Sequence, residues 1–509
     1  MITPSKKDFL RLIENGKIPP LYEEIPYLSP CLIYESLAST NSFLLESVKG
    51  PEKIARYSFI GFNPCLVFKV KNGVMEIDNN PPSPPFSKGG KGGLTEKKII
   101  SSIKPLNALK ELVKTYRQKP FEYLPPFQGG IAGILSYDFV QYLERLPGNA
   151  VDDISLPDAH FLMVDRLIAF DHLFKKCWII VCPGVEDSLR GERERARVDW
   201  SKNYDEAEYE IEKILKTVTG INPKSEIQNS KSKRKIEIIY EMEKAEYMDI
   251  VKKAKEYIAA GDIFQANLSQ RVSAYIGRKN PWSLYRILSS INPSPFAAFI
   301  DFGDYQIISS SPERLLRVKD RMIETRPIAG TRPRGKDVRE DELMRTELLL
   351  NEKERAEHIM LIDLERNDLG RVSDYGSVGV DEFMITEDYS HVIHIVSNVR
   401  GNLAGGKDCF DAIKAAFPGG TITGVPKVRC MEIIDELEPV KRGPYTGSIG
   451  YIGFSGNMDL NIVIRTFVIK DEMAYVQAGA GIVADSDPER EYYETLKKAE
   501  ALIKTLEMI

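Results

Sequence analysis

Two pairs of glutamates have a spacing that suggests chemistry. Glu354 and Glu357 stand three residues apart in the stretch 351–371, NEKERAEHIMLIDLERNDLGR, and Glu491 and Glu494 repeat that spacing near the end of the sequence. Residues three apart share one face of a helix. Carboxylates from two helices could meet at one Mg²⁺ ion, which binds through one or two carboxylates together with waters and substrate oxygens. The alternative is that each pair belongs to an ordinary solvated helix face.

Three further segments carry candidate side chains. Glu313 follows a predicted strand in SSSPER, residues 309–314. The segment 324–335, ETRPIAGTRPRG, is expected to form a rigid loop because of its prolines and glycines. Its arginines suit an anionic ligand, although a structural turn with surface arginines would explain them as well. His394, in YSHVIHIVS, is either a packed core histidine or a catalytic one.

Two glycine-rich segments have different meanings. FPGGTITGVPK, residues 417–427, lacks the GxxxxGK[ST] spacing of a Walker phosphate loop, so nucleotide binding is not predicted. In QAGAGIV, residues 477–483, Gly479 and Gly481 would let backbone N–H groups approach a carboxylate closely. A tight bend in a strand is the structural alternative.

The elements that must position these residues show few βαβ repeats. Helices are predicted at 101–117, 198–216, 351–371 and 244–260, the last ended by Gly261; strands are predicted at 128–138 and 263–272, and a hairpin at 297–309. This pattern favours an α+β fold with large, mainly antiparallel sheets over a doubly wound fold.

Breaker-rich segments divide the chain. The polar segment 219–235 is predicted to link an N-terminal region, 1–218, to a catalytic domain, 236–509. The segment 79–93, NNPPSPPFSKGGKGG, is predicted to be a disordered surface insertion rather than a linear interaction motif.

Composition excludes several classes of function. The net charge is −5, from 69 basic and 74 acidic residues among 509, which argues against nucleic acid as a partner. The six cysteines are scattered without a CxxC pair and there are five histidines, so no zinc site is predicted and a cytoplasmic chain with reduced thiols is expected. The sequence has neither a signal peptide pattern at its start nor an apolar run of about twenty residues that would span a membrane.

Taken together, these segments resemble the chorismate-utilising enzymes, along nearly the whole chain and most closely from about residue 240 onward. The resemblance implies antiparallel sheets in a sandwich with helices packed outside. It also implies that Glu357 and Glu494 are Mg²⁺ ligands, supported through water by Glu354 and Glu491. The cation would hold the ring carboxylate of chorismate, and Glu313 would be the general acid that protonates the departing C4 hydroxyl.

The same resemblance implies the remaining substrate contacts. Residues matching those that hold the two carboxylates of chorismate are Lys498, Arg465, Tyr445, Gly479 and Gly481. His394 and Thr421 match residues that line the ring. Gln265 stands where isochorismate- and salicylate-forming relatives carry a lysine that activates water. Because glutamine cannot act as that base, ammonia is the better nucleophile here.

Two branches of the family compete. Ala329, in PIAGT, is typical of the anthranilate-forming branch, which makes anthranilate and pyruvate on the way to tryptophan, whereas the aminodeoxychorismate-forming branch often has a nucleophilic lysine there. Asn267, Glu365 and the segments FPGGTITG and RGPYTGSIGYI favour the latter branch, which leads to folate. We weigh these segments above one substitution. The alternative from another functional class is a regulatory subunit that binds chorismate or tryptophan but has no catalytic activity.

The resemblance also implies partners. No cysteine lies in a nucleophile-elbow context, so a separate class I glutamine amidotransferase subunit is expected to supply ammonia. The segments LLES and NPSP resemble the family's tryptophan pocket, which assigns Glu46, Ser47, Pro293 and Ser294 to that pocket.

Overall fold

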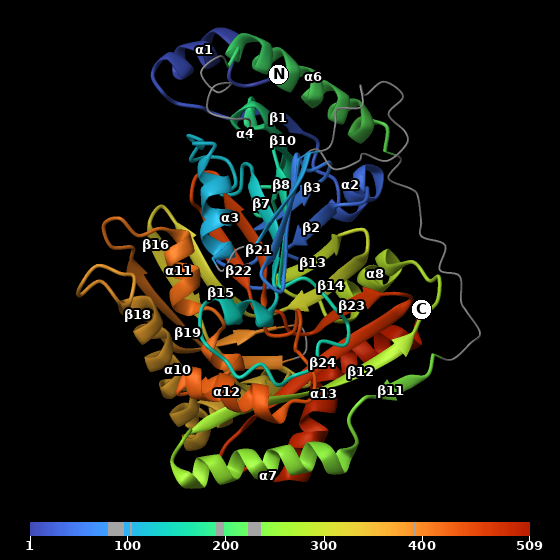
Figure 1. Cartoon of the computed structure of the whole chain (residues 1–509), viewed down its shortest axis with the longest axis vertical. Coiled ribbons are helices and arrows are strands. Elements are labelled where there is room, and N and C mark those ends of the chain that lie inside the picture. Colours follow the sequence, from blue (N-terminus) through green and yellow to red (C-terminus); the bar gives the residue numbers. More distant parts are fainter. Residues whose placement is uncertain (80–95, 102–103, 190–197, 222–235, 390–391) are drawn as a thin grey trace.

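The computed structural model describes residues 1–79, 96–101, 104–189, 198–221, 236–389 and 392–509, folded into two large antiparallel sheets (Figure 1). The first sheet has the order β1 (Leu21–Ile25), β10 (Lys176–Val181), β9 (Arg166–Asp171), β3 (Tyr57–Gly61), β2 (Ser42–Glu46), β13 (Phe296–Asp301), β14 (Tyr305–Ser311), β23 (Thr466–Lys470), β24 (Met473–Ile482), β12 (Gln265–Tyr275) and β11 (Ile238–Tyr240), and β20 (Gly424–Val425) also pairs with β12. The predicted hairpin of β13 and β14 is confirmed.

The second sheet lies against the first. Its order is β17 (Ile328–Pro333), β19 (Val392–Asn402), β16 (Met322–Arg326), β15 (Arg314–Lys319), β22 (Met458–Asn461), β21 (Ser448–Gly453), β7 (Gly130–Leu135), β8 (Ala159–Val164), β4 (Leu66–Lys71), β5 (Val74–Asn79) and β6 (Glu96–Ser101), and β18 (Gly379–Asp388) pairs with β19. Apolar side chains of both sheets, such as Phe59, Ile134 and Ile300, fill the space between them.

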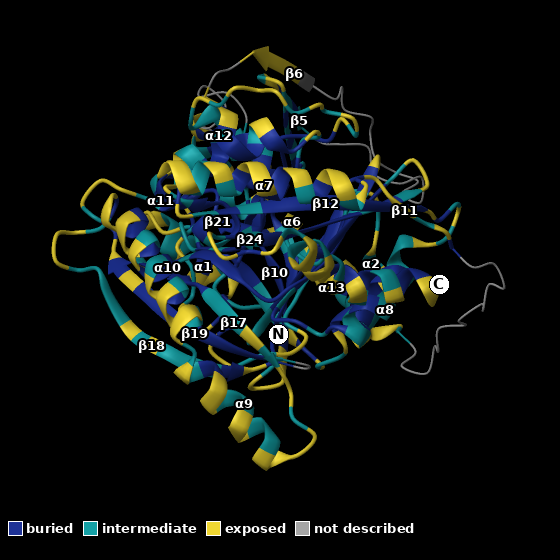
Figure 2. Ribbon diagram, turned by 90° about the horizontal axis from the view of Figure 1, so that it is seen from below, coloured by how far each residue is buried: buried dark blue, intermediate teal, exposed yellow. Residues whose placement is uncertain are grey.

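The helices cover the outer faces of the sheets. They are α1 (Lys6–Glu14), α2 (Pro30–Leu37), α3 (Pro105–Lys114), α4 (Val185–Leu189), α6 (Trp200–Thr219), α7 (Lys244–Ala260), α8 (Pro281–Ile291), α9 (Val338–Leu350), α10 (Glu352–Gly370), α11 (Cys409–Ala416), α12 (Lys427–Leu437) and α13 (Pro488–Glu507), with short 3₁₀ helices η1 (Tyr137–Tyr142) and η2 (Gly420–Ile422). Two outer apolar clusters join helices to sheets, and the exposed faces of α7 and α9 point outward (Figure 2). The predicted sandwich with helices outside is therefore confirmed.

Strands from both sides of the predicted linker pair with one another. β2 pairs with β13 in the first sheet, and β7 pairs with β21 in the second, so each sheet runs through both regions. Figure 1 shows the N-terminal strands, coloured blue, beside β13 and β14. The boundaries 1–218 and 236–509 stay a prediction. Residues 222–235 of the linker, and the insertion 79–93 apart from Asn79, lie outside the described residues.

Local signals explain the elements that carry the site. Asn351 caps α10 by accepting a hydrogen bond from the N–H of Glu354, and Asp487 caps α13 before Pro488. Gly261 ends α7 at φ +83°, as the sequence predicted. The helix predicted at 101–117 is shorter, because β6 extends to Ser101 and the helix begins at Pro105. No helix in the described ranges has the length and hydrophobicity that a bilayer crossing requires.

Candidate active site

Glu313 lies in the short connection between β14 and β15 and is only 6% exposed. Burial raises the pKa of this carboxyl group from 4.5 to about 7, while contacts with Thr421 and the backbone of Ile328 act in the opposite direction. The charges of Arg465 and Lys498 also oppose the rise. Within the described chain, Oε1 of Glu313 has no hydrogen-bond partner. The group is therefore an acid that is partly protonated near neutral pH and free to donate a proton.

Arg465 supplies positive charge close to this acid. It lies between β22 and β23 at φ +52°, a backbone conformation that non-glycine residues seldom adopt. Burial lowers the pKa of its guanidinium group, and the nearby Tyr389 and Glu313 act in the opposite direction. Among the described residues its side chain forms no ion pair or hydrogen bond that would occupy it. An arginine without a carboxylate partner in a partly buried site suits an anionic ligand.

The two predicted glycines, Gly479 and Gly481, lie on β24, which pairs with β12 over ten residues. β12 and β24 place Asn267 opposite Gly481 and Ser269 opposite Gly479. A Cβ atom on Gly479 would lie 2.5 Å from Oδ1 of Asn267 and 2.7 Å from the Tyr445 hydroxyl. Only glycine leaves room there for the polar groups that converge on the strand.

Two amide side chains end at this glycine surface. A Cβ atom on Gly481 would lie 2.5 Å from Nε2 of Gln265. Oε1 of Gln265 and Oδ1 of Asn267 are buried and have no partner in the described part of the chain. Lys498, on α13, donates a hydrogen bond of 3.0 Å to the carbonyl oxygen of Gly479. Unpartnered buried acceptors beside a glycine surface indicate that a polar ligand belongs here.

His394 is buried on β19, opposite Thr331 of β17. Its Nδ1 lies 3.0 Å from the hydroxyl oxygen of Thr331 and 3.1 Å from the carbonyl oxygen of Gly330. Burial, followed by the charge of Arg465, lowers the pKa of the imidazole to about 4, so His394 is neutral at pH 7. Its Nε2 and the hydroxyl of Thr421 have no partner among the described residues, as expected for groups that line a ligand site.

The four predicted metal-binding carboxylates lie near one another on α10 and α13. Burial raises the pKa of Glu357, and the charges of Glu354, Glu491 and Glu494 add to that rise. Burial and the charge of Glu494 likewise raise the pKa of Glu491. Mutual repulsion of this kind means that the negative charge of the cluster is not fully neutralised by the protein.

Part of that charge is balanced by cations of the chain. The ion pairs are Arg332 with Glu354 at 2.8 Å, Lys353 with Glu357 at 4.0 Å and Lys498 with Glu494 at 2.9 Å. In the parts of the chain that are described, no three His, Cys, Asp or Glu side chains are arranged as a metal site. The donor set nevertheless fits Mg²⁺, which prefers carboxylate oxygens and keeps several waters, so few protein ligands are needed.

Ala329 lies on β17 opposite Ile395 of β19, next to Ile328, whose backbone contacts Glu313. The alanine thus occupies the edge of the acid site. A methyl group offers no nucleophile, so no covalent adduct can form at this position.

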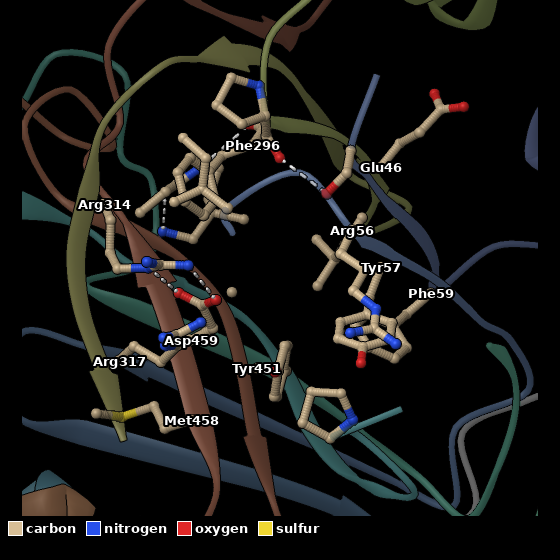
Figure 3. Close-up of a pocket in the computed structure, with 18 of the residues that line it drawn as sticks. Glu46, Arg56, Tyr57, Phe59, Phe296, Arg314, Arg317, Tyr451, Met458 and Asp459 are labelled. Carbon is tan, nitrogen blue, oxygen red and sulfur yellow. Dashed lines mark hydrogen bonds and ion pairs between the residues drawn. The ribbon is translucent and has the colours of Figure 1, made fainter. Parts of the chain in front are cut away.

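A separate cavity of about 320 Å³ lies between the sheets and includes part of the predicted tryptophan pocket (Figure 3). Ser47 lines it and donates a hydrogen bond to the carbonyl oxygen of Pro295 at 3.1 Å. Glu46 lines it too, but its carboxylate points away and bonds to Tyr285 of α8. Pro295 and Phe296 form its wall, whereas Pro293 and Ser294 are not among the lining residues.

This cavity and the acid site are lined by different residues. Arg314 lines the cavity and binds Asp459 at 2.9 Å, whereas Glu313, the preceding residue, is not part of its lining. The cavity residues Arg314 and Asp459 were not predicted from the sequence, because nothing in their spacing sets them apart from a surface ion pair.

The comparisons with known proteins place the chain in a family. Residues 40–504 match the family described as chorismate binding enzyme, so the chain belongs to that family, as the motifs predicted. The solved anthranilate synthase component I from Streptococcus pneumoniae TIGR4 is 35% identical and superposes with a TM-score of 0.74 over 94% of this chain and 99% of that one. The isochorismate synthase MenF from Escherichia coli, 16% identical with a TM-score of 0.67, shares the fold.

The curated relatives carry two names. Anthranilate synthase component 1 of Acetivibrio thermocellus is 45% identical over 470 residues, which are 92% of this chain and 90% of that protein. Aminodeoxychorismate synthase component 1 of Bacillus subtilis (strain 168) is 43% identical over 497 residues, 96% of this chain and 97% of that protein. The chain is thus similar to both kinds of chorismate-aminating enzyme at nearly the same identity.

Proposed function

We propose that the chain is the aminating subunit of an aminodeoxychorismate synthase, converting chorismate and ammonia to 4-amino-4-deoxychorismate. The observation that carries the amination chemistry is Glu313, a buried carboxyl group with a pKa of about 7 and an oxygen that has no hydrogen-bond partner among the described residues. A hydroxyl group leaves readily only when it is protonated, and an acid that holds its proton at neutral pH can supply that proton.

The surrounding residues provide the substrate contacts. Arg465, which has no carboxylate partner in the described part of the chain, offers its guanidinium group to one carboxylate of chorismate. The backbone at Gly479 and Gly481 leaves room for the other carboxylate to approach closely. His394 is neutral and can line the ring without adding charge. Gln265 is not a base, so water is not activated and ammonia remains the nucleophile.

The glutamates of α10 and α13 would hold Mg²⁺. Glu357 and Glu494 are proposed to bind it directly, and Glu354 and Glu491 through water. Bound there, the cation would supply a fixed positive charge for the ring carboxylate of the substrate. The ion pairs of Arg332 with Glu354 and of Lys498 with Glu494 would weaken as the cation binds.

Asn267 supports the proposed branch. Its buried amide oxygen has no partner among the described residues and faces Gly479, so it can accept a hydrogen bond from ammonia or from the new amino group. A valine, which the family resemblance associates with this position in the anthranilate-forming branch, could not. Because Ala329 excludes a lysine adduct, ammonia would add at C4 directly.

Anthranilate synthase component I is the second candidate, and Ala329 is the residue that favours it. The product decides between the two. The chain is incubated with chorismate, Mg²⁺ and an ammonium salt, and the products are separated by liquid chromatography with mass detection. An amino compound that keeps the enolpyruvyl group supports the proposal. Anthranilate with an equal amount of pyruvate would refute the branch, and unconsumed chorismate would point to the regulatory alternative.

A glutamine amidotransferase is the proposed source of ammonia. All six cysteines of the chain are buried, and burial raises the pKa of each thiol, so none is poised as a nucleophile that could hydrolyse glutamine. The isolated chain should turn over chorismate with ammonium but not with glutamine. Turnover with glutamine in the absence of any other protein would contradict the proposed partner.

Tryptophan is the proposed occupant of the separate cavity. Aromatic walls from Tyr57, Phe59 and Tyr451 and the charged pair Arg314–Asp459 suit an aromatic amino acid (Figure 3). Isothermal titration of the chain with tryptophan, against a Tyr451→Ala variant, tests this. Equal heats from both proteins would argue against it.

A further inference from the structure

A second buried carboxyl group, Glu365, lies near Glu313 and has no role in the chemistry described so far. The inward face of α10 ends in Glu365 and Asp368, which are 3% and 1% exposed. Asp368 forms an ion pair with Lys427 of α12, whose Nζ also donates a 3.0 Å hydrogen bond to the carbonyl oxygen of Ala416. Among the described residues, Glu365 has no such cation of its own.

Two segments connect Glu365 to the acid site. In η2, a Cβ atom on Gly420 would lie 3.6 Å from Oε1 of Glu365, and the next residue, Thr421, contacts Glu313. In β16 and the residues after it, the side chain of Thr325 lies near Glu365, and the backbone of Ile328 contacts Glu313. The two carboxyl groups are therefore held against the same two pieces of backbone.

The charges around Glu365 favour its protonated form. Burial is the main cause that raises its pKa, followed by the charge of Asp368, and Glu313 adds to the rise. The charge of Lys427 and the nearby side chain of Thr325 act in the opposite direction. The groups that face Glu313 are Thr421, the backbone of Ile328, Arg465, Lys498, Tyr389 and Glu365 itself. Two acids of similar strength in one dry region can pass a proton between them.

We propose that Glu365 is the proton donor that reprotonates Glu313 during the reaction. When Glu313 protonates the departing hydroxyl, the C–O bond breaks, water leaves and Glu313 becomes a carboxylate. Glu365 then gives its proton to Glu313, and the negative charge moves to Glu365 beside Lys427. The proton that nitrogen releases after the C–N bond forms restores Glu365. Chorismate and ammonia thus give the amino compound and water, with no proton gained or lost by the protein.

This inference rests on the proposed function, although it holds for either branch because the same hydroxyl leaves in both. Its test is the dependence of kcat on pH, measured with saturating chorismate and with the concentration of NH₃ held constant. The variants are Glu365→Gln, which keeps the shape of the side chain, and Glu365→Ala, which removes the carboxyl group altogether. Asp363→Asn is the matched control, because Asp363 lies on the exposed side of the same helix.

In the wild type the pair keeps a proton available until Glu365 itself ionises, and the pKa of Glu365 is raised further than that of Glu313. Without Glu365, the alkaline fall follows the lower pKa of Glu313 alone. In both variants the alkaline fall in kcat should therefore move to lower pH by about one unit, while the KM for chorismate and the control profile stay unchanged. Profiles that superimpose on the wild type, or that are scaled by one factor at every pH, would overturn the inference. If the wild-type chain does not aminate chorismate, or if Glu313→Gln keeps its activity, the proposed function itself fails, which is a distinct result.

Discussion

Replacing Glu313 by glutamine should separate catalysis from stability. Glutamine keeps the size of the side chain but cannot donate an acidic proton. At pH 7, a glutamate with the ordinary pKa of 4.5 would be protonated in about one molecule in 300, whereas a pKa of about 7 makes that fraction about one half. Loss of a positioned general acid costs about 10²–10⁴-fold in rate, so kcat for ammonia-dependent turnover should fall by that factor.

The same substitution should stabilise the folded chain at high pH. Because the folded state binds the Glu313 proton more tightly than the unfolded state, stability falls as the pH rises from 4.5 to about 7. The difference between these two pKa values corresponds to about 3 kcal/mol, which is the most that the wild-type protein loses through this group. Glu313→Gln avoids that loss. Its free energy of unfolding should exceed that of the wild type at pH 8, and the excess should vanish near pH 4.5.

Two measurements check this reasoning. Chorismate consumption, followed by chromatography at a constant concentration of NH₃, gives kcat from pH 6 to 9, and urea unfolding at several pH values gives the stability. Ser448→Ala, a buried change on β21 that removes a hydroxyl group bonded to the backbone of Asn461, serves as a control for nonspecific disturbance. A variant with more than a tenth of wild-type activity, or a stability difference that does not change with pH, would refute the assignment of Glu313 as a buried acid.

Three other predictions concern the metal, the glycine surface and the core. Glu357→Ala should abolish Mg²⁺-dependent turnover and weaken Mg²⁺ binding measured by calorimetry; full activity in EDTA would remove the metal from the mechanism. Gly479→Ala should raise the KM for chorismate at least tenfold because the new Cβ would meet Asn267 at 2.5 Å, and an unchanged KM would mean that this surface does not bind substrate. Arg442→Leu should destabilise the fold by about 3–5 kcal/mol, since it leaves the buried carboxylate of Glu438 without its cation. Chemical denaturation measures this loss, and a change below about 1 kcal/mol would contradict it.

Much of the local structure could be predicted from the sequence. The glycine that ends α7 and the turn between β13 and β14 depend on residues that are neighbours in the chain, and each lies where it was expected. The family could also be predicted, because its motifs are short continuous segments. Candidate site residues such as Glu313 and Gly479 were proposed from the same short segments, and their roles stay predictions.

Other site residues could not be predicted as such. From the sequence, Asn267 and Glu365 could be used only to distinguish the two branches of the family. In the structure, both side chains end close to the acid site. Alternation along the strand that begins at Gln265 places Asn267 on the same face, and this signal could have identified it. No comparable signal exists for Glu365, because its neighbours come from α12, η2 and β16, which are far away in the chain.

The sequence by itself determined which residues are chemically able to act and which short elements carry them. Only the tertiary structure decided that strands from both halves share each sheet, that the carboxylates of α10 and α13 repel one another, and that Glu313 is buried beside Arg465. The physical reason is that propensity, capping and spacing act over a few residues, whereas burial and electrostatic coupling depend on what the fold packs around a group. The identity of a glutamate is written in the sequence, but its pKa is set by the packing around it.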